Sequence, residues 1–260
     1  MNRLQGKRAL ITGASAGIGR ACARAFASYG THLVLLARRR ERLEALAAEL
    51  TDAHGIEVEI HEHDVRDRAA AFRLADDLAA HGCLPDILVN NAGKARGLEP
   101  LQGGDVDDWE EMIDTNVKGL LYMTRAFLPH MVERGHGHVV NIGSIAGRQT
   151  YPRGNVYNAT KFAVRALNEA MNLDVLGTKV RVSSVDPGLV ETEFSEVRFH
   201  GDRERARTVY QGYTPLTPED VADAVCYVAN APEHVNILEL LILPTDQRNA
   251  YLVHKEPVEG

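Results

Sequence analysis

The 260-residue sequence has few cysteines and no long apolar run. Its three cysteines, Cys22, Cys83 and Cys226, lie far apart and match no metal-ligand spacing. We therefore expect buried free thiols of a reducing compartment and no metal site. The 11 histidines are scattered, and His61 and His63 are expected to form a surface pair. No apolar stretch approaches the roughly 20 residues that cross a bilayer, and no secretory leader opens the chain, so we expect a cytoplasmic protein.

Basic residues are outnumbered, with 29 Lys and Arg against 36 Asp and Glu, which gives a formal net charge of −7. This balance argues against nucleic-acid or anionic-membrane partners and leaves a small molecule as the expected ligand. The composition is that of an ordinary globular protein, and the length suits one large α/β domain. No repeat or linker divides the chain, so we expect a single domain over 1–260.

Short apolar runs alternate with amphipathic segments along the chain. The apolar runs predict strands at 7–12, 32–37, 57–64, 86–93, 137–144, 180–188 and 238–243. The amphipathic segments predict helices at 18–30, 38–55, 67–82, 108–134, 155–176 and 218–230. Strands separated by helices form a parallel sheet with helices on both faces. Residues 189–216 and the polar tail 244–260 fall outside the alternation, and the tail is expected to be an ordered extension or an oligomer contact.

The stretch ITGASAGIGRAC, which begins at Ile11, places three glycines between the first predicted strand and the first predicted helix. Ligands of an open parallel sheet bind beyond the carboxyl ends of its strands, where this loop lies. Gly13 permits a tight turn, Gly17 lets a pyrophosphate approach the backbone, and Gly19 lets helix and strand pack closely. The helix N-terminus favours the same anion. The loop therefore predicts a dinucleotide site, the alternative being that the glycines serve only as turns.

Arg38 ends the second predicted strand, 19 residues beyond Gly19, where an NAD-binding chain would carry an acidic residue. Arg39 and Arg40 follow, and no carboxylate comes before Glu41. A guanidinium pairs with a 2′-phosphate, whereas an acid would repel it. Arg38 and Arg39 thus predict NADP rather than NAD. The alternative is that the arginines form the solvated first turn of the next helix, a position where the helix dipole disfavours cations.

Tyr157 and Lys161, in YNATK, are four residues apart in a predicted helix, so their side chains share one face. Tyrosine titrates at about pH 10, too high for a general base at neutral pH, and a neighbouring ammonium lowers its pKa. Ser144 ends the preceding predicted strand, at the same sheet edge as the glycine loop, where its hydroxyl can hydrogen-bond a substrate oxygen. Asn116, in DTNVKG, can bend its helix by taking backbone hydrogen bonds.

These motifs, with NNAG at 90–93 and DPG at 186–188, occur in order and resemble the short-chain dehydrogenase/reductase family over almost the whole chain. The resemblance implies a Rossmann-type, doubly wound parallel α/β sheet of about seven strands. It also implies a catalytic tetrad, in which Tyr157 is the general acid/base and Ser144 polarises the substrate oxygen. Lys161 would lower the tyrosine pKa and bind the nicotinamide ribose, and Asn116 would hold a water of a proton relay.

The resemblance also implies where NADP would be held. The expected contacts come from the glycine loop, the ends of the next strands and the segment after the sixth strand. They are Gly13, Ser15, Gly17, Ile18, Gly19, Arg38, Arg39, Asp64, Val65, Asn91, Tyr157, Lys161, Pro187, Gly188, Val190 and Thr192. Asp64 and Val65 are expected at the adenine and Asn91 at the adenosine ribose. The contacts from Pro187 onward are expected at the nicotinamide end.

The substrate is expected beneath two irregular segments beside the active strand ends, 145–156 and 189–216. An arginine that points inward from them would bind a carboxylate, the alternative being that each arginine is solvated. These arginines are Arg148, Arg153, Arg198, Arg203, Arg205 and Arg207. Arg198 is the first candidate, with Ser144 and Tyr157 as the other substrate contacts.

The stretches 187–202, 216–225 and 234–245 are similar to one branch of the family. Its members are NADP-dependent dehydrogenases of serine, allo-threonine and 3-hydroxy acids, which also reduce malonic semialdehyde, and they are usually homotetramers. The resemblance implies the same activity here. Two alternatives stay open: an NADPH-dependent carbonyl reductase of another ketone, diketone or 3-oxoacyl substrate, and a non-catalytic NADP-sensing protein.

Overall fold

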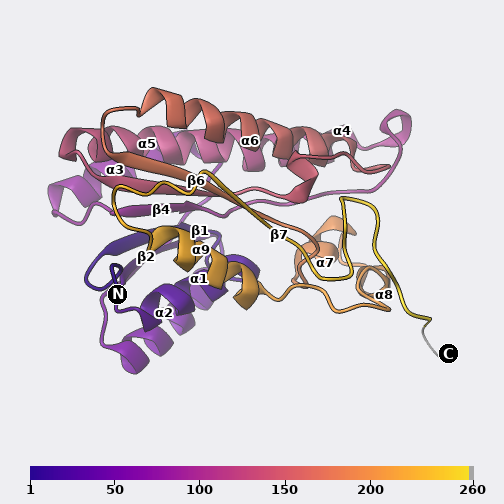
Figure 1. Ribbon diagram of the computed structural model, residues 1–260, viewed down its shortest axis with the longest axis horizontal. Helices are drawn as coiled ribbons and strands as arrows, with labels where there is room; N and C mark the ends of the chain where they lie inside the picture. Colours follow the sequence, from indigo (N-terminus) through magenta and orange to yellow (C-terminus); the bar gives the residue numbers. More distant parts are fainter. Residues whose placement is uncertain (258–260) are drawn as a thin grey trace.

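The computed structural model describes residues 1–257, in which seven parallel strands form one sheet between two layers of helices (Figure 1). The strands are β1 (Arg8–Thr12), β2 (His32–Ala37), β3 (Val58–Glu62), β4 (Ile87–Asn90), β5 (Gly137–Ile142), β6 (Val180–Pro187) and β7 (Glu239–Ile242). Their order in the sheet is β3-β2-β1-β4-β5-β6-β7. The chain thus winds outward from the centre in both directions, and the predicted doubly wound Rossmann-type sheet is confirmed.

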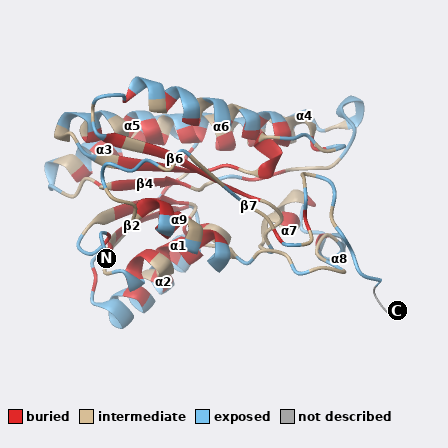
Figure 2. Cartoon of the chain, viewed as in Figure 1, coloured by how far each residue is buried: buried red, intermediate tan, exposed pale blue. Residues whose placement is uncertain are grey.

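The two helical layers bury the two faces of the sheet (Figure 2). One layer holds α1 (Gly17–Ser28), α2 (Arg40–His54) and α9 (Pro218–Ala229), and the other holds α3 (Arg68–Ala80), α4 (Val106–Ile113), α5 (Leu120–Arg134) and α6 (Asn155–Asp174). Alternate residues of each strand point to opposite faces: Ile11 and Leu35 join the core under α1 and α9, whereas Leu10 and Leu36 join the core under α3 and α5.

The helix predicted over 108–134 is divided in three. α4 ends at Ile113, a π-helical segment η2 spans Asp114–Gly119, and α5 follows. Within η2, the side chain of Asn116 both accepts from the Lys94 N–H and donates to the Lys94 carbonyl, at 2.8 Å each. The amide is therefore bonded to the backbone of the β4–α4 loop, and the wide turn brings it there.

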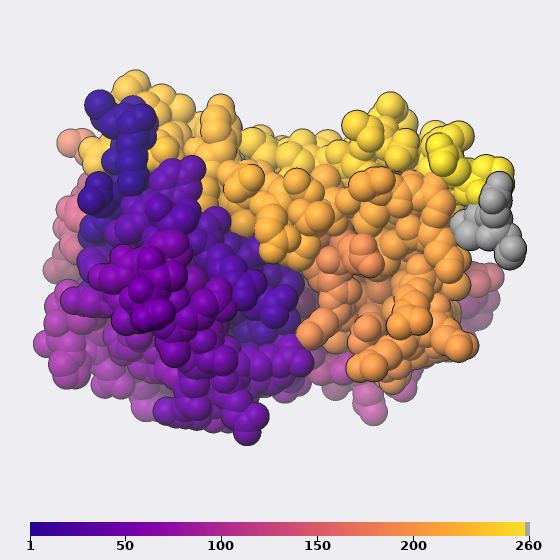
Figure 3. Space-filling model, turned by 90° about the horizontal axis from the view of Figure 1, so that it is seen from below, coloured from indigo at the N-terminus to yellow at the C-terminus, as the bar shows by residue number. Residues whose placement is uncertain are grey.

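Residues 189–216 contain two short helices, α7 (Phe194–Arg198) and α8 (Arg203–Thr208). Both lie beyond the carboxyl ends of the strands, at the end of the molecule where the chain terminates (Figure 1). Two short 3-10 turns, η1 (Leu101–Gly103) and η3 (Ile145–Gly147), complete the structure. In the space-filling view the indigo and purple N-terminal region meets the orange region of α7 and α8 (Figure 3).

The C-terminal tail runs along the segment that contains α7 and α8. The Gln247 side chain accepts from the Leu189 N–H at 2.9 Å, and the Glu256 N–H donates to the Gly212 carbonyl at 2.7 Å. Residues 258–260 of the predicted tail lie outside the described residues. No helix in the described part of the chain is both long and apolar enough to cross a membrane.

Candidate active site

A cavity of about 550 Å³ lies at the carboxyl ends of the strands, between the glycine loop and α7. It brings together residues from nearly every predicted motif. Those that line it are Gly13, Ser15, Gly17, Ile18, Arg38, Arg39, Asp64, Val65, Asn91, Ser144, Tyr157, Lys161, Pro187, Gly188, Val190, Thr192 and Arg198. Gly19 and Asn116 are not among the residues that line the cavity.

The backbone of the glycine loop adopts a conformation that residues with a Cβ atom would disfavour. Gly13 has φ +68° and Gly17 has φ +49°, in the left-handed region that favours glycine. A Cβ atom on Gly19 would lie 2.5 Å from the Gly13 carbonyl oxygen. The Asn91 amide donates to the Thr12 carbonyl at 2.8 Å and so ties the loop to β4. The first turn of α1 has no acidic residue and no side-chain cap, and its residues Gly17 and Ile18 line the cavity, so this helix N-terminus suits an anion.

The two arginines after β2 differ in their bonding. Helix α2 begins at Arg40, so both precede it. Arg39 donates to Glu193 at 2.9 Å and to Ser15 at 3.2 Å. Within residues 1–257, Arg38 forms no hydrogen bond or ion pair, so all its N–H groups are available to a ligand. Glu193 had no signal in the sequence, because its arginine partners, Arg39 and Arg42, are 154 and 151 residues away.

Tyr157 and Lys161 project from the first turns of α6 and are both buried. Burial raises the pKa of Tyr157, while a hydrogen bond with Ser144 and the charge of Arg198 lower it. Lys161 donates to the Ile142 carbonyl at 2.8 Å. Burial lowers the pKa of Lys161 to about 8, against the opposing effect of Asp186. The pKa of Tyr157 is raised overall, and the groups that oppose this rise are Ser144 and Arg198. The lowering of the Tyr157 pKa by Lys161 stays a prediction.

Asn116 lies close to Lys161 across a glycine. A Cβ atom on Gly93 would lie 3.3 Å from Asn116 Oδ1 and 3.8 Å from Lys161 Nζ. Besides its two bonds to Lys94, Asn116 donates to the Thr160 hydroxyl at 3.0 Å. Asn116 thus connects α6 to the loop after β4 through hydrogen bonds. Its role in holding a water stays a prediction.

Arg198, on α7, stands beside the reactive tyrosine. Its guanidinium carbon lies 5.6 Å from the centre of the Tyr157 ring and 5.4 Å from that of Tyr151. Nη2 donates to the Tyr151 hydroxyl at 2.6 Å and Nε donates to the Gly97 carbonyl at 3.1 Å. No bond among the described residues uses Nη1, so this nitrogen remains for a ligand. Among the six described arginines of the two irregular segments, Arg198 alone lines the cavity.

Several residues of the site were missed from the sequence. Tyr151 and Phe194 line the cavity, and Phe194 meets the Tyr157 ring edge-on at 5.5 Å between centres. Their aromatic character in the segments beside the active strand ends was the available signal. Arg148, which was considered for the substrate, instead donates to Asp186 at 2.7 Å and to Glu239 at 2.6 Å.

One expectation was wrong: His61 and His63 are not a surface pair. His63 is buried and lines the cavity, and burial lowers the pKa of its imidazole. His61 is only partly exposed and contacts Glu59 at 2.7 Å. Across the described residues, no three His, Cys, Asp or Glu side chains gather closely enough to hold a metal ion.

The chain is similar to known proteins over most of its length. The family model described as short chain dehydrogenase matches residues 7–202. The NADP-dependent 3-hydroxy acid dehydrogenase of Escherichia coli K12 is 51% identical over 95% of this chain and 99% of its own. Sulfoacetaldehyde reductase 2 of Chromohalobacter salexigens is 44% identical over 95% and 98%. A closed form of serine dehydrogenase complexed with NADP+ superposes with a TM-score of 0.89 at 50% identity, covering 96% of this chain and 100% of that one.

Proposed function

The chain belongs to the short-chain dehydrogenase family, and on that premise we propose that it is an NADP-dependent oxidoreductase of 3-hydroxy acids. The names of two relatives support the cofactor and the substrate class. Serine, allo-threonine and 3-hydroxypropionate, or malonic semialdehyde in the reverse direction, are the substrates of this type. The observation that carries the substrate proposal is the guanidinium of Arg198 over the ring of Tyr157.

The cavity wall fits NADP. The N-terminus of α1 and the backbone at Gly17 would hold the pyrophosphate, and the unengaged Arg38 would hold the 2′-phosphate. Asp64 and Val65 would border the adenine, and the residues after β6 would border the nicotinamide. When bound, the cofactor supplies or accepts the hydride.

Tyr157, Ser144 and Lys161 would manage the proton. The raised pKa keeps Tyr157 protonated at neutral pH, which is the form that donates a proton to a carbonyl oxygen. In the opposite direction, the phenolate of Tyr157, formed when the hydroxyl group has lost its proton, would accept the proton of the substrate alcohol. The Ser144 hydroxyl would hydrogen-bond the same substrate oxygen, and Lys161 would bind the nicotinamide ribose. Asn116, bonded to the loop after β4, would support the water of the proton relay.

Arg198 would select the substrate. In a 3-hydroxy acid one carbon separates the carboxylate from the hydroxyl-bearing carbon. A guanidinium beside the general acid/base can therefore bind the carboxylate while the hydroxyl group reaches Tyr157. Residues 189–216, which carry Arg198, would then cover the substrate within a single domain.

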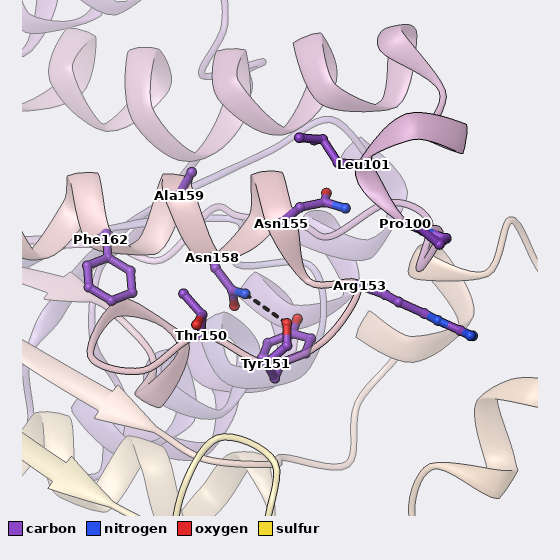
Figure 4. Close-up of a pocket in the computed structure, with 9 residues that line it drawn as sticks. All are labelled: Pro100, Leu101, Thr150, Tyr151, Arg153, Asn155, Asn158, Ala159 and Phe162. Atoms are coloured by element: carbon purple, nitrogen blue, oxygen red, sulfur yellow. Dashed lines mark hydrogen bonds between the residues drawn. The ribbon is translucent and has the colours of Figure 1, made fainter.

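We also propose that the protein is a homotetramer of the cytoplasm. Two separate surfaces expose large apolar side chains, as an assembly with two kinds of interface requires. One includes Val106, Ile113, Leu121 and Phe162 of α4 to α6, and the other includes Leu238 and Leu241 at the free edge of β7. Beside Phe162, an open groove of about 440 Å³ runs along α6 (Figure 4). The three unpaired cysteines suit a reducing compartment.

The test of the substrate proposal is an Arg198→Met variant. We expect KM for 3-hydroxy acids to rise about 10- to 100-fold, the scale of a charge-assisted hydrogen bond, with little change for neutral ketones. Arg207→Met is the control, because Arg207 lies in the same segment, is exposed and does not line the cavity. Equal changes for acids and ketones in Arg198→Met would remove Arg198 from the carboxylate site and favour the general carbonyl reductase. Tight NADPH binding without turnover would favour the sensing protein.

A further inference from the structure

A partly buried ion cluster lies between the loop after β4 and α4, and one of its members, Lys94, lines the cavity. Glu111, on α4, accepts from Lys94 Nζ at 2.5 Å with one oxygen and from Arg96 Nε at 2.8 Å with the other. Lys94 is only 8% exposed. Partial burial alone would raise the pKa of Glu111, but the bonds from Lys94 and Arg96 lower it to about 2. Glu111 is therefore ionised whenever the protein is folded at ordinary pH.

Arg96 connects this cluster to α7. Its Nη1 donates to the Val197 carbonyl at 2.8 Å while its Nε is held by Glu111. The adjacent Gly97 N–H donates to the Arg198 carbonyl at 3.0 Å, and the Gly97 carbonyl accepts from Arg198 Nε at 3.1 Å. The end of α7 is thus joined to residues 96 and 97 by three hydrogen bonds. These bonds set where the Arg198 guanidinium stands over Tyr157.

We propose that Glu111 is a positioning residue for the anionic group of the substrate: through Arg96 it holds the end of α7, and so fixes Arg198 over Tyr157. The inference rests on the proposed function, in which Arg198 binds the carboxylate. Glu111 does not line the cavity, so it acts without touching the substrate. A neutral substrate has no carboxylate to bind Arg198, so its kinetics should not depend on Glu111.

Loss of the carboxylate has a defined physical consequence. Lys94 would remain buried without its counter-ion, and burial, together with the charges of Arg38 and Arg96, already lowers its pKa. Repulsion between Lys94 and Arg96 would no longer be offset by Glu111. Arg96 would move away and lose its bond to Val197. The end of α7 would keep only its bonds to Gly97, and Arg198 would sample more than one position.

The test uses Glu111→Gln. We expect KM for a 3-hydroxy acid to rise about threefold to tenfold, the scale of one lost hydrogen bond, while kcat and the kinetics with a neutral ketone stay unchanged. Glu110→Gln is the matched control, because Glu110 is the exposed neighbour on the same helix. If Glu111→Gln does not fold, Arg96→Lys is the second variant. Lysine keeps the charge beside Glu111 but has no second nitrogen to reach the Val197 carbonyl, so the same change in KM is expected.

A double-mutant cycle with Arg198→Met separates the inference from the proposed function. If Glu111 acts through Arg198, adding Glu111→Gln to Arg198→Met leaves the acid-to-ketone ratio of kcat/KM unchanged. A further loss in that ratio, or an equal loss on both substrates in Glu111→Gln alone, would overturn the positioning role and leave Arg198 in place. If Arg198→Met changes kcat/KM equally for the acid and the neutral ketone, the proposed function fails, and the role of Glu111 fails with it.

Discussion

Replacing Arg38 by alanine tests the cofactor site with little disturbance to the fold. Arg38 is exposed, precedes α2 and forms no hydrogen bond or ion pair within residues 1–257. Its removal therefore breaks no hydrogen bond or ion pair of the described chain. It does remove the cation that the account places at the 2′-phosphate. We expect the variant to fold normally and to lose its preference for NADP.

The size of the effect follows from the exposure of Arg38. A hydrogen bond to a charged group is worth about 1.5–3 kcal/mol, which corresponds to about a 10- to 150-fold change in kcat/KM. Solvent screens an exposed guanidinium, so we expect kcat/KM for NADP to fall about tenfold. NAD has no 2′-phosphate, so kcat/KM for NAD should not change. The effect should also shrink in high salt, because the interaction is between exposed charges.

The assay is the ratio of kcat/KM for NADP to that for NAD, at saturating hydroxy acid and at two salt concentrations. Arg40→Ala is the matched control, since Arg40 pairs with Glu44 at 2.8 Å and does not line the cavity. A drop of the ratio in Arg38→Ala but not in Arg40→Ala is the expected pattern. An unchanged ratio in Arg38→Ala would refute the reasoning and place the phosphate elsewhere.

Two further changes address the chemical step. Tyr157→Phe should bind NADPH with the affinity of the unaltered protein, yet lose turnover by about a hundredfold or more, the scale of positioned acid/base catalysis. Near-normal turnover would show that another group moves the proton. Asp186→Asn removes a carboxylate that favours the charged form of Lys161, so the pKa of Lys161 should fall below its value of about 8. The alkaline limit of the pH–activity profile should then move to lower pH. Glu239→Gln is the control, because Glu239 also pairs with Arg148, and in this variant the limit should not move. A limit that stays in place in Asp186→Asn would remove that carboxylate from the account.

The order of strands and helices could be predicted because each element has its own local signal. The strands at the centre of a parallel sheet are buried on both faces and read as continuous apolar runs, such as ILVN in β4. The break in the helix predicted over 108–134 had one signal, Asn116, whose side chain was expected to bend the helix by taking backbone hydrogen bonds. The cause is a contact between Asn116 and the backbone of Lys94, 22 residues earlier, which only the folded chain brings together.

The residues of the candidate site likewise differ in whether the local sequence predicts them. The glycine loop, Tyr157 and Lys161 could be predicted because their spacing carries the chemistry. Arg198 was the first candidate among six arginines, but its place beside the reactive tyrosine depends on how the five-residue helix α7 packs against Tyr157, which the sequence does not show. Glu111 had no local signal either, because its partners Lys94 and Arg96 lie 17 and 15 residues away.

The central claim, that this NADP-dependent site acts on 3-hydroxy acids, is tested most directly by initial rates of NADP reduction at mildly alkaline pH. The substrates are L-serine, L-allo-threonine, 3-hydroxyisobutyrate and 3-hydroxypropionate, with neutral secondary alcohols of similar size beside them. The account predicts a higher kcat/KM on the acids, because Arg198 pairs with their carboxylate. Equal or faster oxidation of the neutral alcohols would contradict it.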